Sequence, residues 1–245
     1  MTAGRTLLAT TVHAGPESAV LQLGEVHLWL VATAPPEAPS LPPMTPAIGL
    51  WSYEAAERQQ QATTAAERAR AARLQRPGAA ARFLVAHGAL RLILAELLAC
   101  DPQTLPIVTG PNGKPELEGT PVHFNLSHSG AKAAVAVARD RPVGVDLELR
   151  RPLADLDALA RRVCSARELH ALRALAPAER PGAFLALWTR KEALAKRSGE
   201  GLRALHRDVA LAEAGGCRLV ALEDIPGYAA AVAAEGSDWR LIRRT

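Results

Sequence analysis

The sequence predicts an α+β fold made of two units of comparable size. Short runs of apolar and β-branched residues, bounded by glycine or proline, alternate with longer segments of helical periodicity, and both halves of the chain contain both patterns. Nearly half of the residues are apolar and 22% are charged, which is typical of a soluble globular protein. A chain of 245 residues can bury one large core or two cores of ordinary size.

The first unit is predicted to contain a strand, three helices and a hairpin. Residues 1–24 are weakly patterned and are expected to be an N-terminal extension, either a tail or an added strand, so the unit is predicted to cover residues 25–141. Thr64 and Glu67 have the spacing of a capping box, which would start the second helix, and Pro77-Gly78 would end it. The expected elements are a strand at 26–31, a proline-rich loop at 35–46, helices at 48–61, 64–74 and 80–99, a strand at 107–108, a turn at 110–115, and a hairpin of strands 122–126 and 133–138 joined by 127–130.

A second unit is predicted over residues 142–245, with its boundary beside Arg141-Pro142. Its expected elements are a strand from residue 143, helices within 155–176 and 181–197, and strands near 209–211, 218–222, 229–233 and 239–242. The carboxylates at 146 and 148 would then lie just past a domain junction, which is a favoured place for ligand sites.

Composition and charge narrow the possible partners and compartments. A net charge of +4 suits an anionic partner, but the arginines are scattered along predicted helices without an aromatic ladder, so nucleic-acid binding is not expected. The three cysteines are far apart and form no CxxC pair, so neither a disulfide framework nor a zinc site is expected. No membrane-spanning stretch and no convincing signal peptide are found, which favours a reducing cytoplasm.

Two segments carry the residues suited to chemistry. In the predicted strand at 144–148, Asp146 and Glu148 are two residues apart and would point to the same side. In the predicted helix at 188–196, Glu192 and Lys196 are four residues apart and would share one face. Mg²⁺ prefers oxygen ligands and is usually held by a few carboxylates together with water and substrate phosphate. The three carboxylates and the lysine therefore suit a Mg²⁺ ion beside a phosphate.

An ordinary structural role is the alternative for both segments. A half-buried strand has a wet face, and a glutamate four residues before a lysine is a common surface ion pair. Lysine usage favours the functional interpretation, because only four of the 29 basic residues are lysine. Lys191 and Lys196 fall in the second segment, and Lys114 falls in the predicted turn at 110–115. A compact ammonium differs from a planar guanidinium in reach and hydration, so lysine in an arginine-rich chain indicates a site that needs it.

Four motifs in this order resemble the Sfp-type 4'-phosphopantetheinyl transferases over about residues 64–205. They are Gly-Lys-Pro at 113–115, Phe-Asn-Leu-Ser-His-Ser at 124–129, Gly-Val-Asp-Leu-Glu at 144–148, and Trp-Thr-Arg-Lys-Glu-Ala-Leu-Ala-Lys at 188–196. The resemblance implies a pseudo-dimer of two similar α+β subdomains with the active site in the cleft between them. It also implies transfer of the phosphopantetheine arm of coenzyme A to a serine of an acyl or peptidyl carrier protein, with Mg²⁺ bound and adenosine 3',5'-bisphosphate released.

The resemblance also implies roles for individual residues. Those matching the family pattern are Asp146, Glu148 and Glu192 as metal ligands, Lys196 and the pair Ser127 and His128 at the coenzyme's phosphates, Lys114 beside the adenine, and Arg68, Arg70 and Arg82 around the 3'-phosphate. Glu192, directly or through a metal-bound water, is the candidate base for the serine hydroxyl. Lys114 and His128 retain structural alternatives, as a surface charge and a hydrogen-bonded histidine, and Trp188 is expected to belong to the core.

Other functions stay open at this stage. A different Mg²⁺-dependent enzyme acting on a nucleotide pyrophosphate is one, and a non-catalytic module that binds coenzyme A or a carrier protein is another. Two subdomains in one chain favour a monomer. The sequence does not distinguish among fatty acid, polyketide and nonribosomal peptide carriers.

Overall fold

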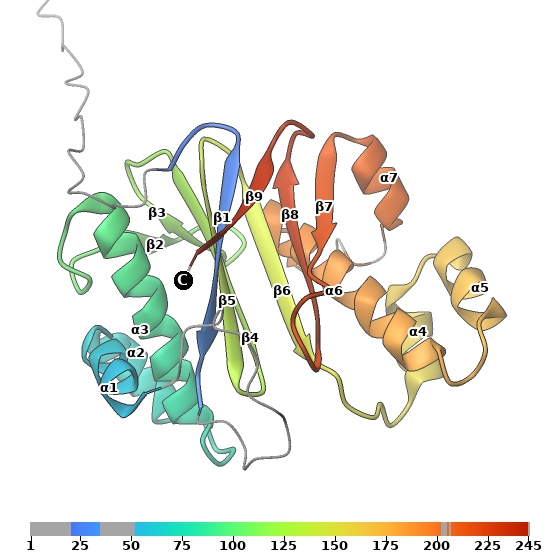
Figure 1. Ribbon diagram of the computed structural model, residues 1–245, viewed down its shortest axis with the longest axis horizontal. Helices are drawn as coiled ribbons and strands as arrows, with labels where there is room; N and C mark the ends of the chain where they lie inside the picture. The colour runs from blue at the N-terminus through green and yellow to red at the C-terminus, as the bar shows by residue number, and fades with distance from the viewer. Residues whose placement is uncertain (1–20, 35–51, 202–204, 206, 245) are drawn as a thin grey trace, which may run out of the picture.

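The computed structural model describes residues 21–34, 52–201, 205 and 207–244 (Figure 1). The predicted extension up to residue 20, the proline-rich loop at 35–46 and the beginning of the predicted helix at 48–61 lie outside these residues. The described part combines helices with three separate sheets, which confirms the predicted α+β class.

The larger sheet has four strands, two from the middle of the chain and one from near each end. Its order is β4 (Val122–Ser129), β5 (Lys132–Arg139), β1 (Glu25–Ala32) and β9 (Arg240–Arg244). β1 runs antiparallel to β5 and parallel to β9, so the last strand completes the sheet that the first strand begins. The predicted strand at 239–242 therefore exists, but it pairs with the first unit's strands.

The second sheet is antiparallel and has three strands. Its order is β6 (Val143–Leu149), β8 (Tyr228–Glu235) and β7 (Cys217–Ala221). A two-stranded ribbon of β2 (Ile107–Thr109) and β3 (Pro115–Leu117) is not hydrogen-bonded to either sheet, but its Leu117 packs in the core on the larger sheet.

Helices cover the outer faces of the two sheets, as Figure 1 shows. The helices are α1 (Tyr53–Gln61), α2 (Ala65–Ala71), α3 (Ala79–Leu98), α4 (Leu156–Val163), α5 (Ala166–Ala174), α6 (Arg180–Ser198) and α7 (Val209–Ala214). α3 packs on the larger sheet through Leu90 and Leu94, while α6 packs on β8 through Ala193 and Leu194.

The two sheets share one apolar core on their inner faces. Side chains alternate across a strand, so every second residue of β5 and β8 points into this core. Many of them are alanine and all are fully or nearly fully buried. Small side chains let the sheets approach closely, which explains the high alanine content of these strands.

Two predictions about local structure are wrong. Residues 209–211, predicted as a strand, begin helix α7, because the Asp208 side chain caps it by accepting from Ala210 N. Residues 127–129, predicted as a hairpin loop, belong to β4, and the turn lies at 130–131. The helices predicted within 155–176 are α4 and α5, and Ser165 starts the second of them through a capping box with Glu168.

The predicted capping box at Thr64 and Glu67 is confirmed and starts α2. The short strand β3 was not predicted, because its three residues carry too little pattern.

Candidate active site

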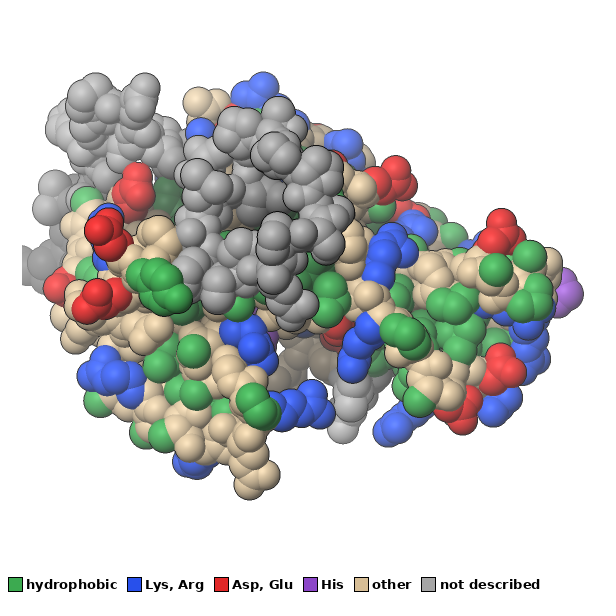
Figure 2. All heavy atoms as spheres, turned by 60° about the horizontal axis from the view of Figure 1, so that its bottom comes forward, with side chains coloured by type: hydrophobic (Ala, Val, Ile, Leu, Met, Phe, Trp, Pro, Cys, Tyr) green, Lys and Arg blue, Asp and Glu red, His purple; other side chains and the backbone are tan. Residues whose placement is uncertain are grey.

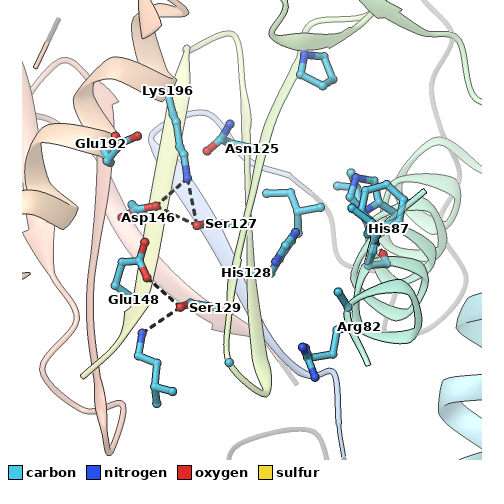
Figure 3. A pocket seen from close by; sticks show the side chains of 18 of the residues that line it. Arg82, His87, Asn125, Ser127, His128, Ser129, Asp146, Glu148, Glu192 and Lys196 are labelled. Carbon is cyan, nitrogen blue, oxygen red and sulfur yellow. Dashed lines mark hydrogen bonds and ion pairs between the residues drawn. The ribbon is translucent and has the colours of Figure 1, made fainter. Parts of the chain in front are cut away.

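A cavity of ≈ 1060 Å³ is lined by residues of α2, α3, β4, β6 and α6. Basic side chains border the hollow in the face shown in Figure 2. Figure 3 shows the two sides of the cavity, with the carboxylates and Lys196 on one side of β4 and His87, His128 and Arg82 on the other. The cavity brings together the segments at 124–129, 144–148 and 188–196, which are far apart in the sequence.

Helix α6 is held directly against β6 by a glycine. A Cβ at Gly144 would lie 2.1 Å from the carbonyl oxygen of Ala193 and 2.4 Å from the backbone nitrogen of Arg197, so no larger residue fits without moving the helix. This close approach sets Glu192 and Lys196 opposite Asp146 and Glu148. The side chains four residues apart on α6 therefore face those two residues apart on β6, and each pair lies on one side of its element, as its spacing predicts.

Asp146 is the best-anchored carboxylate of the site. Its side chain is only 4% exposed, and its Oδ1 lies 2.6 Å from Lys196 Nζ. The hydroxyl of Ser127 donates to the same oxygen at 2.9 Å, and Lys196 Nζ also donates to Ser127 Oγ at 3.0 Å. The buried Oδ2 has no hydrogen-bond partner among the described residues. One oxygen of Asp146 is thus held in place and the other is left for a further ligand.

Glu148 and Glu192 are half-buried beside Asp146. Burial raises the pKa of Glu148, partly offset by a hydrogen bond that Ser129 Oγ donates to its Oε2 at 2.8 Å, and the charge of Asp146 raises it further. Burial also raises the pKa of Glu192, and the charges of Asp146 and Glu148 add to that rise. Three carboxylates that repel one another in a partly buried site would be stabilised by a cation.

The three carboxylates supply the oxygen ligands that a hard cation prefers, but their side chains are too far apart to surround one in this structure. Among the residues that the structure describes, no three His, Cys, Asp or Glu side chains lie close enough together to hold a metal ion as they stand. The unpartnered Oδ2 of Asp146 and the raised pKa values of both glutamates are nevertheless the features that an oxygen-coordinated ion would satisfy.

Ser127 and His128 point to opposite sides of β4. Ser127 pairs with Ala134 and faces β6, whereas His128 pairs with Ala133 and faces α3, where its ring centroid lies 6.4 Å from that of His87. Both line the cavity, which extends around the end of β4. Burial lowers the pKa of His128, and the positive charges of Lys196 and two arginines lower it further, so neutral His128 faces a basic environment.

The α3 side of the cavity is basic and aromatic. The guanidinium of Arg70 lies 5.3 Å from the centroid of the Phe83 ring, and His87 stacks on that ring at 3.8 Å. Burial lowers the pKa of His87 to about 4, and its Nδ1 lies 3.0 Å from Phe83 O. Arg82 is half-buried and donates to Pro77 O at 3.1 Å. Arg70 and Arg82, two of the three arginines expected around the 3'-phosphate, both line the cavity.

Two predicted ligand residues do not line the cavity. Arg68 is exposed and its guanidinium donates to Thr63 O, at the start of its own helix. Lys114 is half-buried, and its Nζ donates to Val143 O at 3.1 Å and to Arg197 O at 2.9 Å. Lys114 therefore ties the turn before β3 to both β6 and α6, while its neighbours Gly113 and Pro115 line the cavity.

Several residues that line the cavity were not predicted as site residues: Arg76, His87, Asn125, Ser129, Arg151 and Trp188. Asn125 and Ser129 belong to a motif that the sequence displayed, but the expectation of a loop at 127–130 hid their alternation with Ser127. Trp188 also packs near Phe184, with ring centroids 6.3 Å apart. It therefore contributes to the core, as predicted, and lines the cavity as well.

Comparison with known proteins identifies the family. A family model for the 4'-phosphopantetheinyl transferase superfamily matches residues 142–235. The chain is 33% identical over 233 residues to the 4'-phosphopantetheinyl transferase HetI of Nostoc sp., covering 87% of this chain and 96% of that relative. The chain belongs to this superfamily. It is thus confirmed as a member of a family of enzymes, as the motifs predicted.

Other members of the transferase superfamily match over shorter segments. The chain is 40% identical over 139 residues to slr0495 of Synechocystis sp., covering 56% of each chain. It is 42% identical over 125 residues to the 4'-phosphopantetheinyl transferase psf-1 of Bacillus pumilus, covering 50% of this chain and 52% of that relative. The match therefore spans only about half the length of these two relatives. Within the described residues, no helix is long and apolar enough to cross a membrane.

Proposed function

We propose that this family member transfers the 4'-phosphopantetheine arm of coenzyme A to a serine of an acyl or peptidyl carrier protein. The observation that carries the proposal is the placement of Asp146, Glu148, Glu192 and Lys196 around one part of a cavity whose opposite side is lined by Arg70 and Arg82. A pyrophosphate near the carboxylates and a second phosphate near the arginines would match this distribution of charge.

The reaction requires stabilisation of negative charge at a phosphate that is attacked. The carrier serine Oγ would form a bond to the β-phosphorus of coenzyme A, and the bond from that phosphorus to the bridging oxygen would break, releasing adenosine 3',5'-bisphosphate. Lys196 would face the α-phosphate and offset the charge of the leaving group. Glu192, whose pKa is raised by burial and by Asp146, would accept the serine proton, directly or through water.

We propose that Mg²⁺ binds at Asp146, Glu148 and Glu192. The ion would supply electrostatic stabilisation of the pyrophosphate. Asp146 is pre-oriented for this role by Ser127 and Lys196, and its Oδ2 is without a partner among the described residues. Lys196 lies 2.6 Å from Asp146 Oδ1, so its ammonium would share the anionic centre with the ion and the phosphate.

The remaining proposed contacts are those to the phosphates, the 3'-phosphate and the adenine of coenzyme A. Ser127 and His128 would contact the phosphates from the two sides of β4. Arg70 of α2 and Arg82 of α3 would hold the 3'-phosphate, and Arg68 would lie nearby on α2. Lys114, whose Nζ is bound to Val143 O and Arg197 O, would lie by the adenine through its neighbours Gly113 and Pro115 in the cavity wall. In this arrangement the bound coenzyme extends across the region between α3 and α6.

We further propose that the chain acts as a pseudo-dimer in one polypeptide, with subdomains at 25–141 and 142–245 and the active site in the cleft between them. β9 would be the element of the second unit that adds to the sheet of the first. Such a molecule would work as a monomer, in the cytoplasm, where coenzyme A and apo-carrier proteins are available. A carrier protein of fatty acid, polyketide or nonribosomal peptide biosynthesis is the proposed substrate.

A modification assay tests the transfer. The purified chain is incubated with coenzyme A and an apo-carrier protein, with and without Mg²⁺, and the mass of the carrier is measured. We expect a phosphopantetheine added to one serine only when the metal is present. A protein that binds coenzyme A or the carrier without any gain in mass would be a non-catalytic module.

Carboxylate variants connect that activity to the site. Asp146→Ala, Glu148→Ala and Glu192→Ala should each nearly abolish the mass gain while the chain stays folded. Glu213→Ala is the matched control, since Glu213 lies on the surface of α7 in an ion pair with Arg190. Near-normal turnover by two of the three variants would refute the proposed ion site.

A further inference from the structure

The two sheets meet along β4 and β6 without a backbone ladder between these strands. β4 is an edge strand of one sheet and β6 is an edge strand of the other. An edge strand exposes a row of backbone N–H groups that need partners when they are buried. At this junction the partners of β6 are side chains of β4, which we call the β4 seam: Asn125, Ser127 and Ser129.

The β4 seam matches β6 residue by residue. Val145 N donates to Asn125 Oδ1 at 2.9 Å, Leu147 N donates to Ser127 Oγ at 3.3 Å, and Leu149 N donates to Ser129 Oγ at 3.1 Å. Both rows advance by two residues, because alternate residues of a strand point the same way. The seam therefore fixes the register of β4 against β6.

Two members of the seam also reach the carboxylates of β6. The hydroxyl of Ser127 donates to Asp146 Oδ1 at 2.9 Å, and that of Ser129 donates to Glu148 Oε2 at 2.8 Å (Figure 3). A hydroxyl has one proton and two lone pairs. Because Leu149 N occupies a lone pair of Ser129, the proton of this hydroxyl is directed to Glu148. Asn125 accepts from Val145 N and, among the described residues, makes no hydrogen bond to either carboxylate.

We propose that Ser129 is a positioning residue for Glu148. By accepting from Leu149 N and donating to Glu148 Oε2, it couples the register of the sheets to the orientation of one carboxylate. Glu148 needs such support more than Asp146, which is nearly fully buried and is also held by Lys196. Without the hydroxyl, the half-buried Glu148 side chain would be free to turn away from Asp146 and Glu192. This role rests on the proposed function, in which Glu148 is an ion ligand.

A double-mutant cycle tests the coupling. Mn²⁺, which carboxylate and water sites accept in place of Mg²⁺, is titrated into the full-length chain and its four variants: Ser129→Ala, Glu148→Gln, the double variant, and Ser129→Thr. We expect Ser129→Ala to weaken Mn²⁺ binding by about tenfold, as is typical when the partner of a ligand is removed. In the Glu148→Gln background the same change should have little further effect. Ser129→Thr keeps the hydroxyl and should bind as the parent does.

Stability measurements separate positioning from a purely structural role. Asn125→Ala removes a seam acceptor that does not contact a carboxylate, so it should lower the melting temperature at least as much as Ser129→Ala. If Ser129→Ala lowered the melting temperature and left Mn²⁺ affinity unchanged, while Glu148→Gln reduced it, the positioning role would be wrong and the proposed function would stand. If Ser129→Ala reduced Mn²⁺ affinity by the same factor in the parent and in the Glu148→Gln background, the positioning role would also be wrong. Unchanged affinity in Glu148→Gln would refute the ion site itself.

Discussion

Lys196 joins the two strands that carry the site, since its ammonium contacts both Asp146 on β6 and Ser127 on β4. A guanidinium is planar and larger, so it does not fit at the same distance from both oxygens. Lys196→Arg should therefore reduce transfer by roughly 10²- to 10³-fold, a loss typical of removing one charge-stabilising donor. Steady-state kinetics of carrier modification measures this change.

Lys132→Arg is the matched control for that substitution. Lys132 Nζ lies 5.7 Å from the centroid of the Tyr228 ring, an interaction that arginine also makes, and it does not line the cavity. Its variant should be as active as the parent. If Lys196→Arg were equally active, the requirement for an ammonium would be wrong.

The arginines of α2 and α3 allow a test with two coenzymes. Dephospho-coenzyme A lacks only the 3'-phosphate. Arg70→Ala and Arg82→Ala should therefore weaken the binding of coenzyme A by about tenfold or more, as expected for a lost charged hydrogen bond, and should change the binding of dephospho-coenzyme A little. Isothermal titration measures both affinities. Arg68→Ala is the comparison, because Arg68 donates to Thr63 O and does not line the cavity. Equal losses for both coenzymes would indicate a general electrostatic role.

At the scale of elements, the distance between α6 and β6 is set at Gly144. Gly144→Ala would put a methyl group against the α6 backbone, and the helix would move outward with Glu192 and Lys196. We expect a loss of about 1–3 kcal/mol in the free energy of unfolding, typical of overpacking, and a fall in kcat of up to about 10²-fold. Gly182→Ala, in the same helix, is the control, since the nearest atom to its Cβ would be Arg150 Nη1 at 3.4 Å. Full activity in Gly144→Ala would show that this approach is not needed.

α6 uses a second lysine for stability. Lys191 is buried, lies 2.7 Å from Glu168 Oε2, and donates to the carbonyls of Leu205 and Arg207 at 2.8 and 2.7 Å. Lys191→Met would leave the Glu168 carboxylate buried without its counter-charge, which costs about 3–5 kcal/mol in the free energy of unfolding. Urea denaturation measures it.

The partly exposed pair of Arg190 and Glu213 provides the reference for that measurement. Arg190→Met, on the same helix, should cost at most about 1 kcal/mol, because exposed pairs contribute little. Similar losses in the two variants would contradict a special role for the buried pair. The two lysines that this arginine-rich chain has on α6 thus serve different purposes, with Lys196 at the cavity and Lys191 in the core.

For the whole molecule, the net charge of +4 leads to a prediction about the carrier. Carrier proteins acidic around their modified serine would be steered toward a basic enzyme, and salt screens such steering beyond about 10 Å. Raising the ionic strength should therefore increase KM for the carrier more than KM for coenzyme A, which in the proposed site would be held by short contacts. Comparable increases for both substrates would argue against steering.

Local signals predicted most elements well. The capping box at Thr64 and Glu67 needed only residues three positions apart, and it was found where expected. The strand assigned to 209–211 failed because its apolar residues fit either period, and the side chain of Asp208 decided for a helix. The prediction of a hairpin loop at 127–130 failed because serine and glycine favour turns locally, whereas here the hydroxyls of the two serines accept from backbone N–H groups of β6.

The sequence by itself determined the family of this protein, through four motifs of fixed order, and it set three carboxylates and a lysine at spacings of two and four. Tertiary structure alone decided which charged groups reach the cavity. Arg70 and Arg82 line it, whereas Lys114 binds two carbonyls, and Ser129 gains a carboxylate partner. Spacing encodes contacts within one helix or strand, but pairs such as Ser127 with Asp146, or Glu25 of β1 with Arg240 of β9, exist only because separate elements pack together.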